Sequence, residues 1–267
     1  MSAVFEIRDA SMNDDVLGIL FYFDRSKRFF IELLSQYDEW DAPFLLVGFV
    51  ERKEYSIDSE WSMKWVRQRI VPPERQNIGA ILKNAGLDHY DEYKLLLLSE
   101  GRGAQDDLYI KRISEDGIPD EIRTRLKKKV RDVIPLSDNR VLVFFKDGKA
   151  GRLDINTKCG ENRIFGNVLS SAGSFDQVKV SPGGNGIEWD EDRFISAETL
   201  YKEVTQTDDD YDAYLRFTSL RLAETANVCD VMECTRQYVS RMVRENKIAP
   251  VYTGGQTRMF LKADIEA

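Results

Sequence analysis

The sequence predicts a multidomain α+β protein, in which two small α+β domains precede a short module of two helices and a β-hairpin. Three observations support this prediction. The chain of 267 residues is long enough for two domains or three small ones. Short apolar runs with strand character alternate with helical patterns along most of it. Charge is also uneven, with changes near residues 123 and 206 that favour domain boundaries there.

The composition is that of a globular protein and argues against several functional classes. Hydrophobic residues make up 42% and charged residues 31%, so a core can form. The longest apolar run, residues 16–23, is less than half of a membrane span, and no signal segment follows Met1, so we expect a cytoplasmic protein with no membrane partner. Three cysteines and one histidine favour neither a disulfide scaffold nor a His-rich metal site, and we expect no cofactor.

The first predicted domain covers residues 1–122. It opens on two strands, Leu17–Phe23 and Phe29–Leu33, which a polar tetrapeptide joins. The period then becomes helical at Trp61 and Trp65, and the prolines that follow end this helix. The other elements predicted in this domain are an apolar run at 44–50, helices at 76–85 and 93–98, and a strand at 108–110.

A basic run opens the second predicted domain, residues 123–205. Six of the nine residues at 123–131 are Lys or Arg. We expect a solvated face here, with contact to a phosphate or a partner as the alternative.

The rest of this domain has the pattern of two hairpins and one helix. Asp147-Gly148 predicts a tight turn between strands at 141–145 and 151–155. A glycine-rich turn separates two further strands at 178–180 and 186–189. Ser196 is expected to cap a closing helix that runs to Val204.

An acidic segment predicts a linker over residues 206–217. From Leu215 to the end, eight Lys and Arg residues face six Asp and Glu residues, so the tail carries +2 and the rest −10 of the net −8. A flexible linker would let its carboxylates reach the basic tail and compete with phosphates, whereas a simple spacer would never touch it. These carboxylates are Asp208, Asp209, Asp210 and Asp212.

The tail, residues 218–267, begins with a short predicted helix. Thr225 is expected to cap it, and Val228, Val231 and Met232 are expected to form its apolar face. A tight connection at Glu233-Cys234 follows.

A second helix, from Arg236 to about Asn246, is predicted with Thr235 as its cap. Val239, Met242 and Val243 stand at i, i+3 and i+4, so they must face the core. The opposite face then carries side chains that reach base edges and phosphates, namely Arg236, Gln237, Ser240, Arg241 and Arg244.

A strand, a glycine turn and a strand complete the tail. Val251-Tyr252 and Met259–Leu261 flank a turn that contains Gln256 and Arg258. Two helices, a tight connection and such a wing make the layout of a winged helix-turn-helix, whose second helix enters the major groove.

The tail resembles the excisionase-like and MerR-like DNA-binding domains over residues 235–248 and 254–265. It departs from them at Glu233 and Asn246, where these families often have Gly. The resemblance implies binding to double-stranded DNA. Together with the exposed face, it gives the candidate DNA-binding residues Thr235, Arg236, Gln237, Ser240, Arg241, Arg244, Gln256 and Arg258.

Two further stretches resemble known families. The second domain resembles the uncharacterised domain-of-unknown-function family 2442, which implies a fold and no chemistry. Its matching segments are 130–136, 142–148, 153–154, 187–190 and 196–201. The first domain resembles the accessory N-terminal segment of HipA-like toxin kinases, without the kinase body, which implies a binding or assembly module. Its matching segments are 65–75, 81–82, 86–87, 101–102 and 106–109.

Together these features predict a non-enzymatic, sequence-specific DNA-binding transcriptional regulator. An antitoxin-like autoregulator of a toxin–antitoxin or mobile-element operon is the specific form that we expect, with a partner protein on the body and a homodimer on DNA. The first alternative is an interaction or inhibitor protein whose helix-turn-helix serves autoregulation only. The second is an enzyme with a site around Arg67, Arg69, Arg75, Glu100 and Arg102.

Two cysteines of the tail are weak candidates for a site. Cys229 and Cys234 have no histidine beside them, whereas zinc takes four ligands. We therefore expect buried or half-buried thiols here rather than a metal centre.

Overall fold

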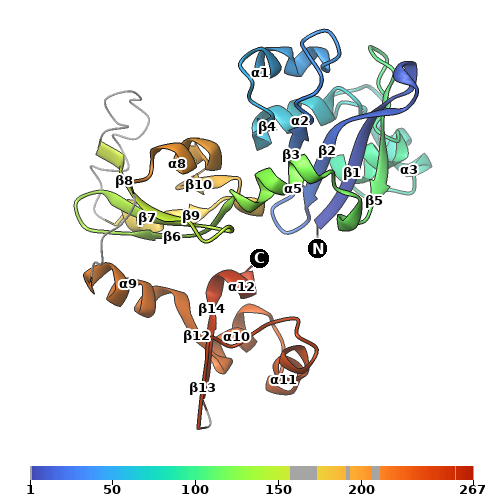
Figure 1. The fold of residues 1–267 in the computed structure, drawn as a ribbon. Coiled ribbons are helices and arrows are strands. Elements are labelled where there is room, and N and C mark those ends of the chain that lie inside the picture. Colours follow the sequence, from blue (N-terminus) through green and yellow to red (C-terminus); the bar gives the residue numbers. More distant parts are fainter. Residues whose placement is uncertain (1, 157–172, 191–192, 206–210, 256, 267) are drawn as a thin grey trace. The chain divides into compact units, whose positions relative to one another are not determined.

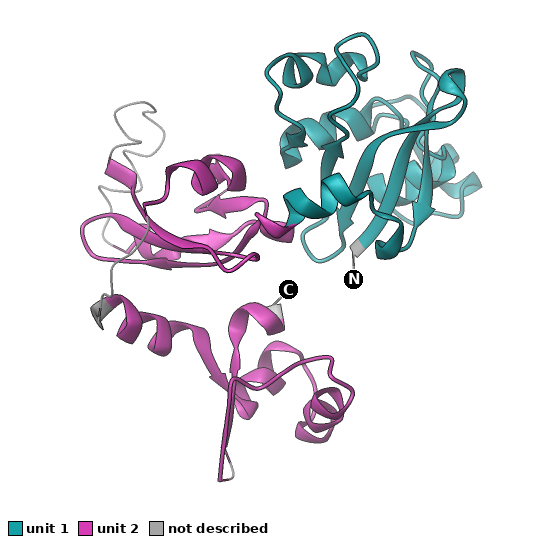
Figure 2. Cartoon of the chain, viewed as in Figure 1, with its two compact units in different colours: residues 1–126 teal, residues 127–267 magenta. Residues whose placement is uncertain are grey.

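The computed structural model describes residues 2–156, 173–190, 193–205, 211–255 and 257–266. Within these ranges it is a multidomain α+β fold with four small antiparallel sheets and short helices (Figure 1). Packing divides the chain into two compact units, residues 1–126 and 127–267 (Figure 2). The boundary predicted after residue 122 falls inside helix α5 (Asp120–Lys127). Across the described ranges, no helix has both the length and the apolar character needed to cross a membrane.

An antiparallel sheet organises the first unit. Its strands are β1 (Ser2–Asp9), β2 (Asp15–Phe23), β3 (Arg28–Leu33), β4 (Ser56–Ile57) and β5 (Leu108–Ile113). They lie in the order β4-β3-β2-β1-β5. The predicted strands β2, β3 and β5 are confirmed. Strand β1, which we did not predict, pairs with both β2 and β5 and so joins the end of the unit to its beginning.

The helices of the first unit follow the predicted periods in part. Three of them were predicted, namely α2 (Ser59–Arg67), α3 (Ile78–Asn84) and α4 (Glu92–Leu98). Helices α1 (Val47–Glu51) and α5 were not predicted. Asp58 caps α2 by accepting a hydrogen bond from the amide of Trp61 at 2.9 Å. The apolar run at 44–50 forms a 3-10 turn that continues into α1.

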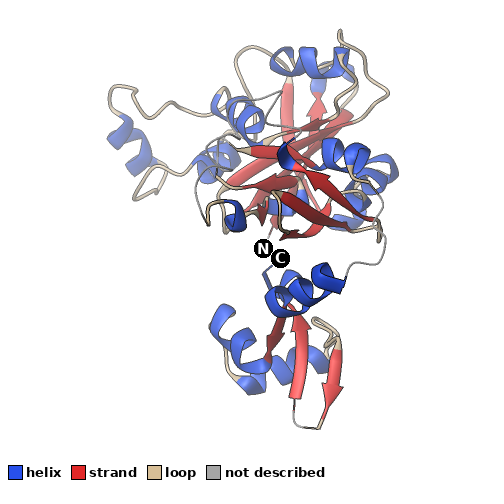
Figure 3. Ribbon diagram, turned by 90° about the vertical axis from the view of Figure 1, so that its left-hand side faces the viewer, coloured by secondary structure: helices blue, strands red, loops and turns tan. Residues whose placement is uncertain are grey.

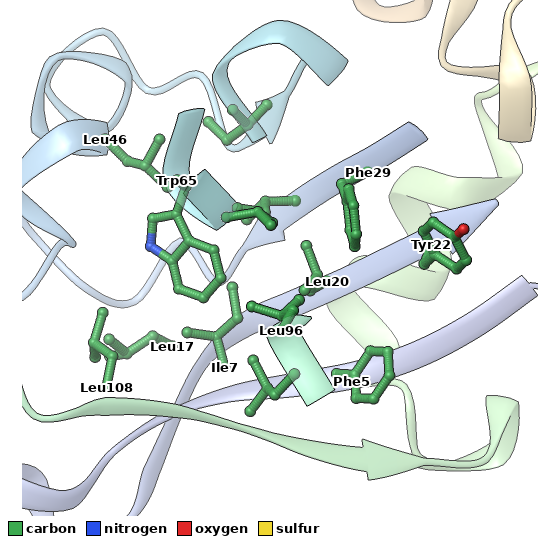
Figure 4. Close-up of a cluster of buried hydrophobic side chains, with 14 of the residues drawn as sticks. Phe5, Ile7, Leu17, Leu20, Tyr22, Phe29, Leu46, Trp65, Leu96 and Leu108 are labelled. Atoms are coloured by element: carbon green, nitrogen blue, oxygen red, sulfur yellow. The ribbon is translucent and has the colours of Figure 1, made fainter. Parts of the chain in front are cut away.

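Apolar side chains cover both faces of the sheet. Leu20 points to the face covered by Trp65 of α2 and its neighbours (Figure 4). Ile19 points to the opposite face and packs with Ile122 of α5. Successive residues of a strand point to opposite faces, so burial on both sides explains the continuous apolar run Leu17–Phe23.

Part of the basic run at 123–131 is structural, against our expectation of a solvated face. Arg125 of α5 places its Nε 3.1 Å from Oε2 of Glu32, a carboxylate of β3 whose side chain is 2% exposed. The same guanidinium pairs with Glu121 at 2.9 Å and donates to the carbonyl of Leu33. These bonds fasten α5 to the sheet.

The second unit begins with two small antiparallel sheets and a helix. Their elements are β6 (Val130–Pro135), β7 (Arg140–Phe145), β8 (Ala150–Asp154), β9 (Lys179–Val180), β10 (Gly186–Glu188), β11 (Phe194–Ser196) and α8 (Ala197–Glu203). Both predicted hairpins are confirmed, and β6 and β11 add one strand to each. Ser196 caps α8 as expected and accepts from the amide of Thr199 at 3.1 Å. Val143, Trp189 and Leu200 lie in the shared core.

Helix α9 (Tyr211–Arg221) occupies much of the segment where we predicted an acidic linker, residues 206–217. That prediction is wrong for residues 211–217, which are helical. The remaining residues of the predicted linker, with Asp208, Asp209 and Asp210, lie outside the described residues. The competition of the acidic carboxylates with phosphates stays a prediction.

Helix α9 is held against the outer face of the sheet formed by β6, β7 and β8. Its Ala213 and Phe217 pack with Leu142 and the other apolar residues on that face. Arg221 at its end places Nε 2.9 Å from Oδ1 of Asp132, a buried carboxylate of β6. An apolar contact that orders both partners explains why this segment is folded in spite of the acidic run before it.

The tail of the second unit is a small sheet with helices beside it (Figure 3). Its elements are β12 (Leu222–Glu224), α10 (Thr225–Val231), α11 (Arg236–Arg244), β13 (Tyr252–Gly254), β14 (Thr257–Leu261) and α12 (Lys262–Glu266). Strand β14 lies between β12 and β13. The predicted strand–turn–strand pattern is confirmed as the hairpin β13–β14, whereas β12 was not predicted.

Replacing Arg125 by Ala should loosen the first unit. It removes a cation with which the buried Glu32 carboxylate pairs, which we expect to cost about 3 kcal/mol in the opening free energy of the β3 amides. Hydrogen–deuterium exchange of the full chain measures this locally. Lys127→Ala removes the same charge from an exposed position of the same helix and should change that free energy by less than about 0.5 kcal/mol. Equal effects of the two variants would contradict the structural role of Arg125.

Candidate nucleic-acid interface

A tight turn connects α10 to α11. The amide of Cys234 donates to the carbonyl of Cys229 at 3.0 Å, and the amide of Glu233 donates to the carbonyl of Asp230 at 3.4 Å. Glu233 between them has φ 48°, in the left-handed region. These two bonds and this conformation make a Schellman motif, the usual way in which glycine ends a helix. The turn forms here with Glu, in spite of the cost of a left-handed conformation for a residue with a side chain.

Helix α11 begins and ends as the sequence predicts. The hydroxyl of Thr235 accepts a hydrogen bond from the amide of Tyr238 at 3.3 Å, so it caps the first turn. At the other end Asn246 has φ 53°, and the amide of Lys247 donates to the carbonyl of Met242 at 2.9 Å. The helix is thus held by a cap at its start and a second Schellman motif at its end.

One face of α11 packs into the core of the tail. Val239 and Met242 are buried and Val243 is partly buried, as their spacing predicts. The other buried members of this core are Ala223, Val228, Ile248, Phe260 and Ile265. These contacts fix the rotation of the helix, so they also fix which side chains face solvent.

The predicted polar face of α11 is exposed. Ser240 is half-buried at the edge of the face. The exposed side chains are those of Arg236, Gln237, Arg241 and Arg244. Thr235 is exposed too, but its hydroxyl is engaged as the cap.

Tyr238 is a further exposed residue of this face, which we did not predict. It is 41% exposed, and the guanidinium carbon of Arg241 lies 4.7 Å from its ring centroid. Tyr238 therefore restricts Arg241 by a cation–π contact. The sequence could have indicated this contact, because Tyr238 is an aromatic residue three positions after the cap Thr235 and outside the apolar stripe of the helix.

Glu245 is the acidic residue beside this face. Its Oε2 lies 2.7 Å from Nζ of Lys247, and its Oε1 lies 3.9 Å from Nε of Arg241. The hydrogen bond from Lys247 lowers the pKa of Glu245, so the carboxylate is charged at neutral pH. It neutralises one cation and leaves a net positive face.

The hairpin β13–β14 joins the polar face of α11. Arg258 of β14 directs Nη1 toward Oγ of Ser240, 3.5 Å away, so two predicted site residues from separate elements meet. Tyr252 on β13 is exposed and lies against Gly254, where a Cβ would come within 2.1 Å of the tyrosine hydroxyl. Gln256, also predicted for the site, lies outside the described residues.

Two details of α10 differ from the prediction. Thr225 is already helical, and Glu224, the last residue of β12, stands at the cap position with its amide donating to Oδ1 of Asn227 at 3.2 Å. The strand therefore sets where this helix starts. Val231 is 49% exposed rather than part of the apolar face, because α10 ends at it.

Three arginines of the alternative site in the first unit bind separate carboxylates. Arg67 lies 3.5 Å from Glu92, and Arg102 lies 3.5 Å from Glu100. Arg69 is buried, and its Nη2 lies 2.5 Å from Asp106. Burial lowers the pKa of Arg69, and the carboxylate partly offsets this effect. Arg67, Arg69 and Arg102 are thus divided among three ion pairs.

Arg69 also lies over an aromatic ring. Its guanidinium carbon is 3.7 Å from the centroid of Trp65, a fully buried side chain of the core. The pair contributes to packing in the first unit.

Comparison with known proteins identifies one region of the chain. Residues 130–206 match the family described as a protein of unknown function, DUF2442. This confirms the predicted resemblance of the second domain. No curated protein matches the chain significantly. The resemblances of the tail and of the first domain to other families stay predictions.

One solved structure is similar to part of the chain. It is the crystal structure of NE0471 from Nitrosomonas europaea, which is described as a suspected DNA-binding protein. The identity is 16%, the match covers 46% of this chain and 79% of that chain, and the TM-score is 0.26. A TM-score of this size supports no inference about function.

Most substitutions lower the stability of a protein, but a glycine at the left-handed Glu233 is expected to raise it. Glu233→Gly should stabilise the tail by about 0.5–1 kcal/mol, because glycine adopts this conformation without the steric cost. Hydrogen–deuterium exchange of the α11 amides measures the change. Glu233→Ala removes the same charge but keeps the strained conformation, so it should give no such gain. Equal protection in both variants would mean that the turn is not strained.

Proposed function

We propose that the tail of this protein binds double-stranded DNA with α11 in the major groove, and that the chain is a transcriptional regulator. The observation that carries the proposal is the division of α11 into two faces. The core face fixes the helix through Val239 and Met242, and the exposed face presents Arg236, Gln237 and Arg241. Arg and Gln are side chains that recognise guanine and adenine edges.

The dimensions and the charge of this surface support the proposal. An α-helix with its side chains is roughly 10–12 Å across, which matches the roughly 12 Å width of the major groove. The nine residues of α11 give it about two and a half turns with which to contact bases. Arg258, at the hairpin, extends the cationic surface beyond the helix toward the flanking backbone. Cations in this position bind phosphates and set the register, while the helix contacts the bases.

The rest of the chain suits a binding role in this proposal. In the first unit Arg67, Arg69 and Arg102 are engaged in ion pairs, and we assign no catalytic step to these three residues. A regulator that represses its own operon, as an antitoxin does, needs a body for a partner protein and a tail for DNA. The predicted likeness of the first domain to an assembly segment of toxin kinases is the support for that setting.

Arg241→Ala tests the proposed interface. The variant should bind a selected DNA site about 10- to 100-fold more weakly, which corresponds to about 1–3 kcal/mol, with a smaller salt dependence. Fluorescence anisotropy against a sequence found by in vitro selection measures this.

The chain offers a closely matched control for this experiment. Arg52 is 56% exposed against 57% for Arg241, lies over Phe49 as Arg241 lies over Tyr238, and pairs with Glu54 as Arg241 pairs with Glu245. Arg52→Ala therefore has the same loss of charge and similar loss of contacts in a different unit. Equal affinities of the two variants would remove Arg241 from the interface.

We also propose that the protein binds DNA as a two-fold dimer. A single module of this size covers a small DNA surface and binds weakly, and a palindromic site read by a dimer is the usual remedy. The buried apolar residues of the tail are used in its own core, so the body should supply the contact. Light scattering with operator DNA present should give the mass of two chains plus one DNA duplex. A monomer at high concentration, with and without DNA, would exclude this arrangement.

A further inference from the structure

Two cysteines occupy a special pair of positions in the turn between α10 and α11. In a Schellman motif the third residue from the helix end and the second residue after its cap are brought together, and their side chains usually touch. Here these residues are Cys229 and Cys234, joined by the 3.0 Å bond between the amide of Cys234 and the carbonyl of Cys229. The motif thus places two thiols where most helices have an apolar contact.

The two thiols are in contact and partly buried. Both side chains pack at the edge of the tail core, and the backbone bond between the two residues holds them next to each other. Neither cysteine is in a disulfide. The turn that holds them has a fixed geometry, because Glu233 between them is in the left-handed conformation and its amide bonds to Asp230.

We propose that Cys229 and Cys234 are a thiol–disulfide modification site, and that closure of the disulfide weakens DNA binding by α11. The first clause rests on the geometry of the turn alone. The second clause rests on the proposed function.

The oxidant is a low-molecular-weight disulfide such as oxidised glutathione. One cysteine, as the thiolate, attacks a glutathione sulfur, forms a mixed disulfide and releases one reduced glutathione. The second cysteine then attacks the mixed disulfide and displaces the second glutathione. The protein loses two hydrogen atoms, which the two released glutathiones carry, and one S–S bond replaces another.

The environment of the pair sets the speed of this reaction. Burial raises the pKa of the Cys234 thiol, and the neighbouring Cys229 raises it further. Less thiolate is present at neutral pH than for an exposed cysteine, so closure should be slow compared with that of exposed thiols. The disulfide should therefore form under sustained oxidation rather than during a brief exposure to the oxidant.

Closure acts directly on the recognition helix. Cys234 precedes Thr235, whose hydroxyl caps α11. Bringing the two sulfur atoms to the length of a covalent bond moves Cys234 toward α10 and with it the start of α11. The contact between Ser240 and Arg258, which joins this helix to the hairpin, then no longer has its present geometry.

The experiment uses the full chain with Cys159→Ser, so that the pair holds the only thiols. The protein is equilibrated with mixtures of oxidised and reduced glutathione and then digested with trypsin. Residues 222–236 lie between two trypsin sites and contain both cysteines, so one peptide reports on the pair. We expect this peptide to lose the mass of two hydrogen atoms, with the chain unlinked to other copies on a non-reducing gel.

The equilibrium constant for disulfide closure by glutathione is measured in folded and in urea-unfolded protein. The comparison decides whether the fold itself favours closure. We expect closure to be favoured on the order of tenfold or more in the folded state, because the turn already holds the two cysteines next to each other. An equal or smaller constant in the folded protein would overturn the proposal, as would a stable mixed disulfide with glutathione on either cysteine.

DNA affinity of the reduced and closed forms tests the second clause. We expect the closed form to bind the selected site several-fold more weakly, with recovery after reduction. The control is Cys229→Ser/Cys234→Ser in the same background, which should bind equally before and after the glutathione treatment. Unchanged or tighter binding by the closed form would overturn this clause. If the reduced protein binds no DNA, the proposed function fails, and the peptide mass still decides the first clause.

Discussion

The need to cover both faces of small sheets determines how this chain is built. Strands β2 and β3 and strands β6 and β7 carry apolar side chains on both sides, so each of these sheets needs a partner on its second face. Helix α5 covers the first sheet and α9 covers the second. Both helices overlap the charged segments in which the sequence suggested a domain entry and a linker. Each is fastened by an arginine to a buried carboxylate, Arg125 to Glu32 and Arg221 to Asp132.

The elements that depend on local signals were predictable from the sequence. The apolar runs of β2 and β3, the Asp147-Gly148 turn and the caps Ser196 and Thr235 all appear where expected. The elements that depend on distant partners were missed. Strand β12 has three residues and exists because it pairs with β14, nearly forty residues later. Helix α9 was missed because its acidic neighbours suggested solvation, whereas its order comes from a sheet formed much earlier in the chain.

The candidate site shows the same division. The period of Val239, Met242 and Val243 was enough to assign the exposed face of α11, because one buried stripe on a helix determines the opposite one. The contact between Ser240 and Arg258 and the stacking of Arg241 on Tyr238 involve the hairpin and the rotamers, which no spacing rule describes. The two positions that lack the usual glycine, Glu233 and Asn246, still form left-handed turns. Surrounding packing thus outweighs the local preference of the residue.

The docking of α9 affects how the tail can be separated or exchanged. A fragment that starts at residue 218, the predicted edge of the tail, would be cut within α9, and would leave Ala213 and Phe217 behind. The remaining body would keep these two residues on the apolar patch around Ile134 and Leu142, but it would lose the rest of α9 and the bond from Arg221 to Asp132. A helix shortened in this way covers the patch less firmly, which favours aggregation. Recombination that grafts such a tail onto a new body must therefore carry the whole helix and find a sheet face that matches it. Helix α9 therefore connects the tail to the sheet of β6, β7 and β8 through a packed apolar surface.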